Sequence, residues 1–134
     1  MNASDEIARL QAAAERAQDG YHHEEAVGYY TQALEVAPEG DEAAAQMLRY
    51  DLHFGRGQSY EWIGDIPAAI VDFEAAVRLA ESLAPEEENL ARQAEALNRL
   101  ADLTFDQAGA SQAEELAQKA LELARLAGDP RVEA

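Results

Sequence analysis

The side chains best suited to proton transfer or metal binding are three histidines, His22, His23 and His53. His22 and His23 are adjacent and precede Glu24 and Glu25 in the sequence. Neighbouring positions on a helix point in different directions, so this run does not bring its ligands together around one ion. We therefore interpret the pair as structural or solvent-exposed.

Acidic side chains are grouped in a way that favours helix starts over catalysis. The run Glu86-Glu87-Glu88 and the pair Glu114-Glu115 fall in the first turns of expected helices, where carboxylates complement the helix dipole. The sequence has no phosphate-binding glycine loop, no nucleophile elbow and no cysteine. We predict that the chain is not an enzyme and has no catalytic residues, no cofactor and no metal site.

The charge balance excludes other functions. Ten basic and 27 acidic side chains give a formal net charge of −17, which repels nucleic acids and anionic membrane surfaces. A solvated helix surface is the favoured explanation of this charge, and a basic partner is the alternative. The start of the chain lacks a leader pattern and no apolar run approaches a membrane span, so we expect a cytoplasmic protein without a membrane partner.

The elements that must position these side chains are helices. Hydrophobic residues make up 48% of the 134 residues, and only four prolines occur. Glycine and proline divide the chain into six predicted helices, at 4–18, 23–37, 41–63, 67–83, 86–107 and 111–127. One helix ends at Gly64 with Pro67 opening the next, and Gly109 with a capping box from Ser111 to Glu114 marks a later turn.

An internal repeat links these helices. Three nine-residue segments begin at Ala26, Ala69 and Ala113, which lie 43 and 44 residues apart. The eighth position of each segment is also alanine, two helical turns along the same face. A further small residue lies 12 positions before each opening alanine, namely Ala14, Gly57 and Ala101. This pattern predicts close packing of the two helices of a hairpin, three times over.

The repeat resembles the tetratricopeptide repeat (TPR) family, with a longer period than the usual 34 residues. The second copy carries Gly57-x2-Tyr60, then Gly64-Asp65, then Ala69-x3-Phe73-x2-Ala76, with His53 and Arg56 in place of a bulky apolar pair. We expect His53 to be wedged between helices. The first copy keeps Ala26-x3-Tyr30-x2-Ala33-x4-Pro38, and the third keeps Leu97-x2-Leu100-Ala101 and Ala113-x3-Ala117-x2-Ala120.

The resemblance implies an all-α fold, an α-solenoid of three TPR-like helical hairpins. The hairpins span 4–38, 41–84 and 86–128 and form a single domain over residues 1–134. Six or seven antiparallel helices would be wound into a right-handed superhelix.

In this family the first helix of each hairpin lines a concave groove that takes a peptide or a helix of a partner. The positions carried over to this chain are mostly acidic, amide or aromatic: Gln11, Glu15, Gln18, Asp19, Asp51, Phe54, Gln58, Glu61, Trp62, Glu95, Asn98, Asp102, Phe105 and Asp106. They predict a protein–protein interaction scaffold with a basic or apolar ligand. We expect Phe54 to be the most exposed of the aromatics, whereas Trp62 and Phe105 face either the groove or the core.

The sequence does not favour one ligand class of the family. Members that bind the C-terminal carboxylate of Hsp70 or Hsp90 chaperones use a clamp of Lys, Asn and Arg. Here Gln11, Glu15, Gly55 and Glu95 stand at clamp positions, and only Arg99 matches. Carboxylates at these positions would repel a peptide carboxylate, so we predict no binding of such peptides.

Self-assembly is the alternative function. Apolar residues extend over more than one face of the last predicted helix, whereas helical stacks normally end in a polar capping helix. The possible self-association face contains Leu116, Leu123 and Leu126. Either two copies form a homodimer through this face, or the chain is a fragment whose next repeat begins near residues 131–134.

Overall fold

The computed structural model describes the backbone of residues 2–108 and 110–128 and the side chains of residues 2–105 and 112–128. Several predicted features lie outside these residues. They are the helix break at Gly109, the side chain of Ser111 in the capping box, and a further repeat near residues 131–134.

Six α-helices and no strand make up the described part of the chain. They are α1 (Ala3–Asp19), α2 (His23–Val36), α3 (Ala43–Ile63), α4 (Ile66–Glu81), α5 (Glu87–Ala108) and α6 (Ala110–Ala127). Every helix end lies within two residues of the predicted one, which confirms the all-α class. Within these residues, no helix is both long and apolar enough to cross a membrane.

Local side chains explain several helix ends. The Asn2 side chain accepts a hydrogen bond from the Asp5 backbone at 2.9 Å and caps α1. Gly64 ends α3 with a φ of 93°, a left-handed conformation that favours glycine. Asp65 then caps α4, and Pro67 lies in the first turn of that helix as predicted.

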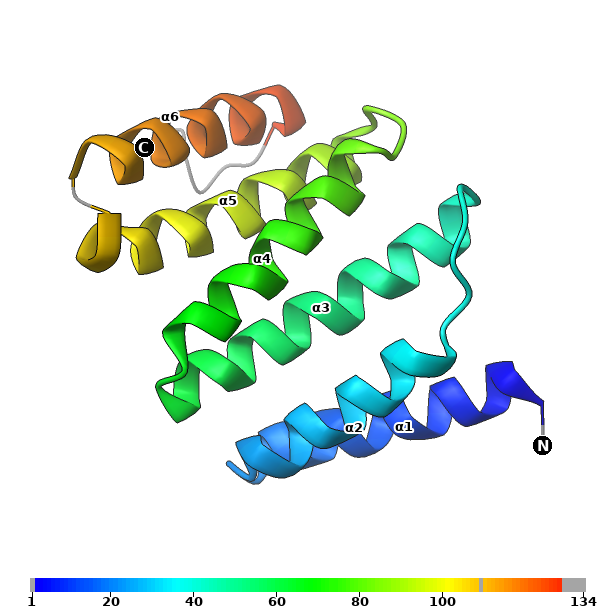
Figure 1. Cartoon of the computed structure of the whole chain (residues 1–134). Coiled ribbons are helices and arrows are strands. Elements are labelled where there is room, and N and C mark those ends of the chain that lie inside the picture. The colour runs from blue at the N-terminus through cyan, green and yellow to red at the C-terminus, as the bar shows by residue number, and fades with distance from the viewer. Residues whose placement is uncertain (1, 109, 129–134) are drawn as a thin grey trace.

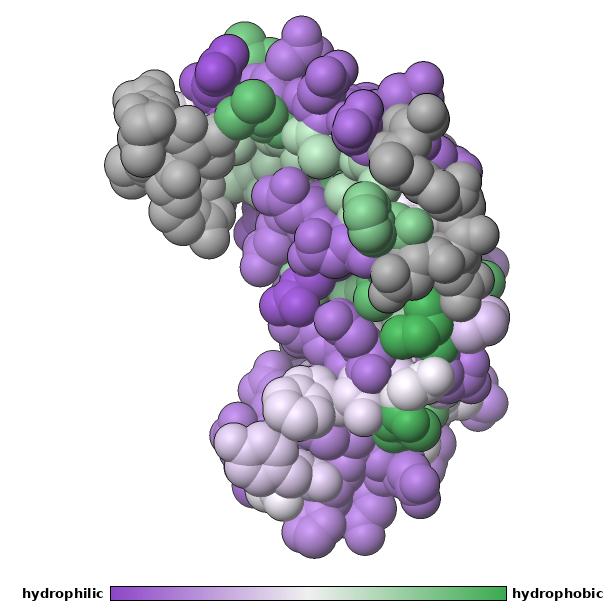
Figure 2. Space-filling view, turned by 90° about the vertical axis from the view of Figure 1, so that its left-hand side faces the viewer, coloured by the Kyte–Doolittle hydropathy of each residue, from purple (hydrophilic) through white to green (hydrophobic). Residues whose placement is uncertain are grey.

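Consecutive helices run in opposite directions, and each packs against the next along the chain (Figure 1). The outline of the molecule is bent and hollowed on one side (Figure 2). Hydrophilic side chains predominate along the hollowed side. In this arrangement α1, α3 and α5 each begin a pair of helices, and side chains from these three helices meet at one hollow, which is described below.

The small residues of the repeat are buried, as the packing stripe predicts. This holds for all nine of them: Ala14, Ala26, Ala33, Gly57, Ala69, Ala76, Ala101, Ala113 and Ala120. At Gly57 a methyl group would stand 3.0 Å from the Phe73 ring, so glycine allows α3 and α4 to approach closely. The repeat therefore marks the contacts between paired helices.

The buried apolar residues form two clusters. The first joins α1, α2 and Leu52 of α3, and it contains Leu10 and Tyr30. The second runs through α3, α4, α5 and α6 around Phe73 and Leu97. The last two pairs of helices thus share one core, whereas the first pair has its own.

A candidate protein-interaction face

A hydrogen-bonded network fixes Gln18, a predicted groove residue of α1, against α3. Its amide nitrogen donates to the Gly55 carbonyl at 2.8 Å and to Ser59 Oγ at 3.0 Å. Its amide oxygen accepts from the Tyr30 hydroxyl at 2.9 Å. The Gln18 amide is therefore engaged in holding α1, α2 and α3 together.

The position of Gly55 follows from the same network. A methyl group on Gly55 would lie 2.5 Å from Cζ of Tyr30, so the Tyr30 ring occupies the space that a larger residue would need. Burial, followed by the charges of Glu15 and Asp51, raises the pKa of Tyr30 to about 12. The hydroxyl stays protonated at neutral pH and remains a donor to Gln18.

Three acidic residues from different helices, Glu15, Asp51 and Glu95, influence titratable groups on α3. The pKa of Asp51 on α3 is raised, first because neighbouring helices reduce the hydration of its carboxylate and then because of Glu15 on α1. Arg92 on α5 opposes this rise. The pKa of Tyr50 is raised by burial and then by Glu95 and Asp51. Glu15, Asp51 and Glu95, predicted groove residues of α1, α3 and α5, thus form one acidic region.

An aromatic cluster of Tyr21, His23 and Trp62 lies where the first and second pairs of helices meet. The His23 and Trp62 rings are stacked, with centroids 5.3 Å apart and planes inclined by 6°. The Tyr21 ring packs edge-on against both, at 5.8 Å from Trp62 and 6.1 Å from His23. Tyr21 is nevertheless 73% exposed and Trp62 68% exposed. The three rings thus pack against one another while Tyr21 and Trp62 keep most of their surface exposed.

The backbone around Tyr21 is held in an unusual conformation. Tyr21 has a φ of 61°, which costs a non-glycine residue roughly 1–2 kcal/mol. Its N–H donates to the Gln18 carbonyl at 3.0 Å, and the His22 N–H donates to the Ala17 carbonyl at 2.7 Å. These bonds fix the turn between α1 and α2 and place the Tyr21 ring against Trp62.

Two hollows share the aromatic cluster. The inner hollow, of about 380 Å³, is lined by the cluster together with Gln18, Gln58, Glu61 and Arg99. The outer hollow, of about 360 Å³, is lined by the cluster together with His22, Glu24, Glu25 and Ile63. Each volume is at the small end of the range for ligand sites and suits a single side chain.

The inner hollow gathers four of the predicted groove residues, Gln18, Gln58, Glu61 and Trp62. Glu61 on α3 pairs with Arg99 on α5 at 3.5 Å, and both side chains are partly exposed. Arg99 is the residue that matched the chaperone clamp, and here its charge is directed at a carboxylate. Of the described residues that line the inner hollow, Glu61 is the one carboxylate, and Arg99 balances its charge.

Other predicted groove residues lie elsewhere. Glu15, Asp19, Asp51, Glu95, Asn98, Asp102 and Phe105 are exposed. Gln11 lines a separate hollow of about 650 Å³ between the start of α1 and the loop that precedes α3. The Asp106 side chain lies outside the described part of the structure.

The prediction that Phe54 would be the most exposed of the aromatic groove residues was wrong. Phe54 is only partly exposed, because it stacks on Tyr50 at 5.7 Å and packs edge-on against Phe73 at 5.3 Å. Trp62 and Phe105 are instead the exposed rings, at 68% and 58%. Neither of them closes the core of its helix pair.

The leucines of the possible self-association face are placed differently from one another. Leu116 and Leu123 are half-buried and pack against the core shared by α3 to α6. Leu126 is 72% exposed. Two of the three leucines of this face therefore pack within the chain.

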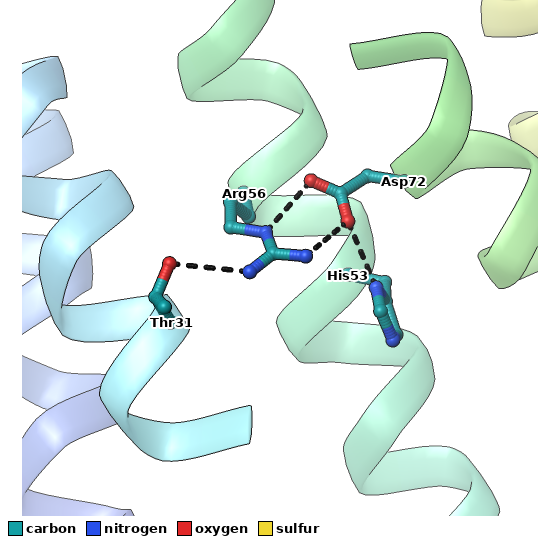
Figure 3. A network of polar contacts seen from close by, with 4 residues as sticks. All are labelled: Thr31, His53, Arg56 and Asp72. Carbon is teal, nitrogen blue, oxygen red and sulfur yellow. Dashed lines mark hydrogen bonds and ion pairs between the residues drawn. The ribbon is translucent and has the colours of Figure 1, made fainter. Parts of the chain in front are cut away.

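A second polar network joins α2, α3 and α4 (Figure 3). Asp72, with 1% of its surface exposed, accepts hydrogen bonds from Arg56 at 2.8 Å and lies 2.9 Å from His53 Nδ1. Arg56 also donates to the Thr31 hydroxyl at 3.1 Å. Burial by itself raises the pKa of Asp72, but the hydrogen bonds from His53 and Arg56 outweigh burial and hold that pKa below its usual range.

This network accounts for the two polar residues that replace the apolar pair of the repeat. His53 lies against α4, as expected for a residue wedged between helices, and its partner is Asp72. Within the described residues, no group of three or more His, Asp or Glu side chains is arranged to hold a metal ion. The buried polar side chains here link helices to one another.

Comparison with protein-family models and with curated proteins finds no match to this chain.

The sequence alone did not single out Tyr21, His23 and Arg99 as neighbours of Trp62. Tyr21 follows Gly20 in a helix break, where an aromatic residue has no periodic position to predict its direction. His23 and Ser59, whose Nδ1 and Oγ atoms are 3.3 Å apart, are separated by 36 residues in the chain. No local pattern connects such positions.

Proposed function

We propose that this chain is a non-catalytic protein-interaction module of the TPR type. It binds a basic or partly apolar peptide segment of another protein across α1, α3 and α5. The observation that carries the proposal is the inner hollow, where the exposed Trp62 lies beside the amides of Gln18 and Gln58 and beside the ion pair between Glu61 on α3 and Arg99 on α5.

The chemistry of this face supports a peptide ligand. An exposed aromatic ring anchors an apolar or cationic side chain, and neighbouring amides and carboxylates orient the backbone and select positive charge. The acidic region around Asp51 extends the same preference along the face. The net charge of −17 attracts a basic segment at long range, and this attraction weakens as salt increases.

Selection of a random peptide library on the wild-type protein tests the proposal. We expect selected peptides to be rich in Arg, Lys and apolar residues. Their affinity should fall by about tenfold or more in a double variant carrying Trp62→Ala and Glu61→Lys, because both the anchor and the charge preference are lost.

The matched control carries Val71→Ala and Glu74→Lys. Both residues are exposed on α4, which contributes no residue to either hollow. The control makes the same change in net charge and should keep wild-type affinity. Equal losses in the two variants, or a selection that yields no binding peptide, would overturn the proposed function.

A further inference from the structure

The outer hollow differs from the inner one in its charge. In the inner hollow, Glu61 already pairs with Arg99. In the outer hollow, Glu24 and Glu25 are exposed at the start of α2, and neither is in an ion pair within the described residues. The outer hollow therefore combines aromatic rings with two carboxylates that form no ion pair within the described residues.

Aromatic rings and carboxylates are the two kinds of side chain that bind a cation most favourably, and both line this small hollow. A cation is attracted to the face of an indole or phenol ring, and a carboxylate adds a charge-assisted hydrogen bond. Tyr21 and Trp62 supply exposed ring surface, and the stack with His23 fixes the indole in place. The site is ordered before a ligand arrives, which lowers the entropic cost of binding.

Arginine fits this combination better than lysine. Its guanidinium is planar, so it stacks on an aromatic ring while its N–H groups remain free to bond a carboxylate in the same plane. The chain itself contains such an arrangement, because the Arg56 guanidinium lies 5.9 Å from the Tyr60 ring centroid and donates to Asp72. A lysine ammonium is a point charge that is more strongly hydrated.

We propose that Tyr21 and Trp62, with Glu24 and Glu25, form a receptor for one arginine side chain of the partner protein. The proposal rests on the peptide-binding function above and names the residue that the partner presents. The remainder of the partner segment lies along the inner hollow, which shares the same rings.

Trp62 provides a direct probe, because it is the only tryptophan in the chain. The protein is titrated with blocked arginine (N-acetyl-arginine amide), and the fluorescence of Trp62 is recorded. Blocked citrulline, a neutral group of nearly the same shape, and blocked lysine serve as comparison ligands. We expect a saturable change with arginine, binding about tenfold weaker with citrulline, and intermediate binding with lysine.

Variants of the acidic residues show which carboxylates bind the arginine side chain. The double variant Glu24→Gln with Glu25→Gln should bring the affinity for arginine down to that for citrulline. Glu35→Gln, an exposed change on the same helix that lies outside both hollows, should leave the arginine affinity unchanged. If Glu61→Gln abolishes the preference while the double variant keeps it, the cation binds in the inner hollow and the assignment to Glu24 and Glu25 is overturned.

Different experimental results would contradict the arginine receptor and the peptide-binding function. Equal responses to arginine and citrulline, or no response to arginine, would overturn the arginine receptor even if the peptide selection succeeds. A selection that yields no peptide, together with a saturable response to blocked arginine, would overturn the peptide-binding function and leave the arginine site in place.

Discussion

Polar networks cross the junction between α1–α2 and α3–α4, whereas a continuous apolar core spans the junction between α3–α4 and α5–α6. At the first junction, Gln18 bonds to Gly55 and Ser59, and Arg56 bonds to Thr31. At the second, Leu97 and its neighbours join a single cluster with Phe73, and hydrogen bonds such as that from the Tyr50 hydroxyl to the Arg92 carbonyl lie at its margin.

The two kinds of junction respond differently to change. Apolar burial is non-directional, so it tolerates small shifts and is insensitive to pH. A buried polar network depends on each donor and acceptor, and removal of one partner leaves the other desolvated and unpaired. The first junction should therefore be the more sensitive to single polar substitutions. The aromatic cluster of the candidate site lies at this first junction.

The largest expected loss of stability comes from Asp72→Ala. The substitution leaves the Arg56 guanidinium without its buried carboxylate, which should lower the free energy of unfolding by about 3–5 kcal/mol. Urea denaturation followed by circular dichroism measures this loss. Glu74→Ala, an exposed change on the same helix, is the control and should stay within about 0.5 kcal/mol of wild type. Similar stabilities of the two variants would show that the network does not stabilise the packing of α2, α3 and α4.

A smaller loss of stability is expected from Gly55→Ala. The new methyl group would meet the Tyr30 ring at 2.5 Å and push it away from Gln18. We expect a loss of about 1–3 kcal/mol in the same urea assay. Gly28→Ala is the matched control, because nothing lies within 4 Å of a methyl group there. Alanine should stabilise that helix by about 0.5–1 kcal/mol, and a stabilising Gly55→Ala would contradict the close packing.

The smallest expected effect is the pH dependence of the network centred on Asp72, which joins α3 to α4 and reaches α2 through Arg56. The pKa of Asp72 is lower in the folded chain than the value of about 3.9 in an unfolded chain. The ionised carboxylate therefore stabilises the fold fully above about pH 4. This contribution is lost as the pH falls through the folded-state pKa, by about 1.4 kcal/mol for each unit of difference.

Urea midpoints of the wild type and of Asp72→Asn, measured between about pH 6 and pH 3, test this dependence. The difference in urea midpoint between the two proteins should become smaller as the solution becomes more acidic. Leu97→Ala, a change in the apolar core, should lose about 2–5 kcal/mol at both ends of the range. A constant difference for Asp72→Asn would mean that the carboxylate is not stabilised by its partners.

Much of the fold could be predicted from the sequence. The helix ends follow from caps and breakers such as Gly64 and Pro67, which act within one turn. The buried alanines follow from a repeat that recurs at nearly constant spacing. The exposure of single aromatics could not be predicted, because Phe54 and Trp62 lie on the same helix and only the neighbouring rings of Tyr50 and Phe73 decide that Phe54 is covered.

The sequence by itself determined the six helices, their packing stripe and the acidic character of the chain, because these depend on composition and on residues close together in the sequence. Only the tertiary structure decided that Tyr21, His23 and Trp62 form one cluster between two hollows. It also decided that Gln18 bonds to Ser59, 41 residues away, and that Asp72 lies between His53 and Arg56. These contacts depend on how the helix pairs pack, which no local pattern specifies.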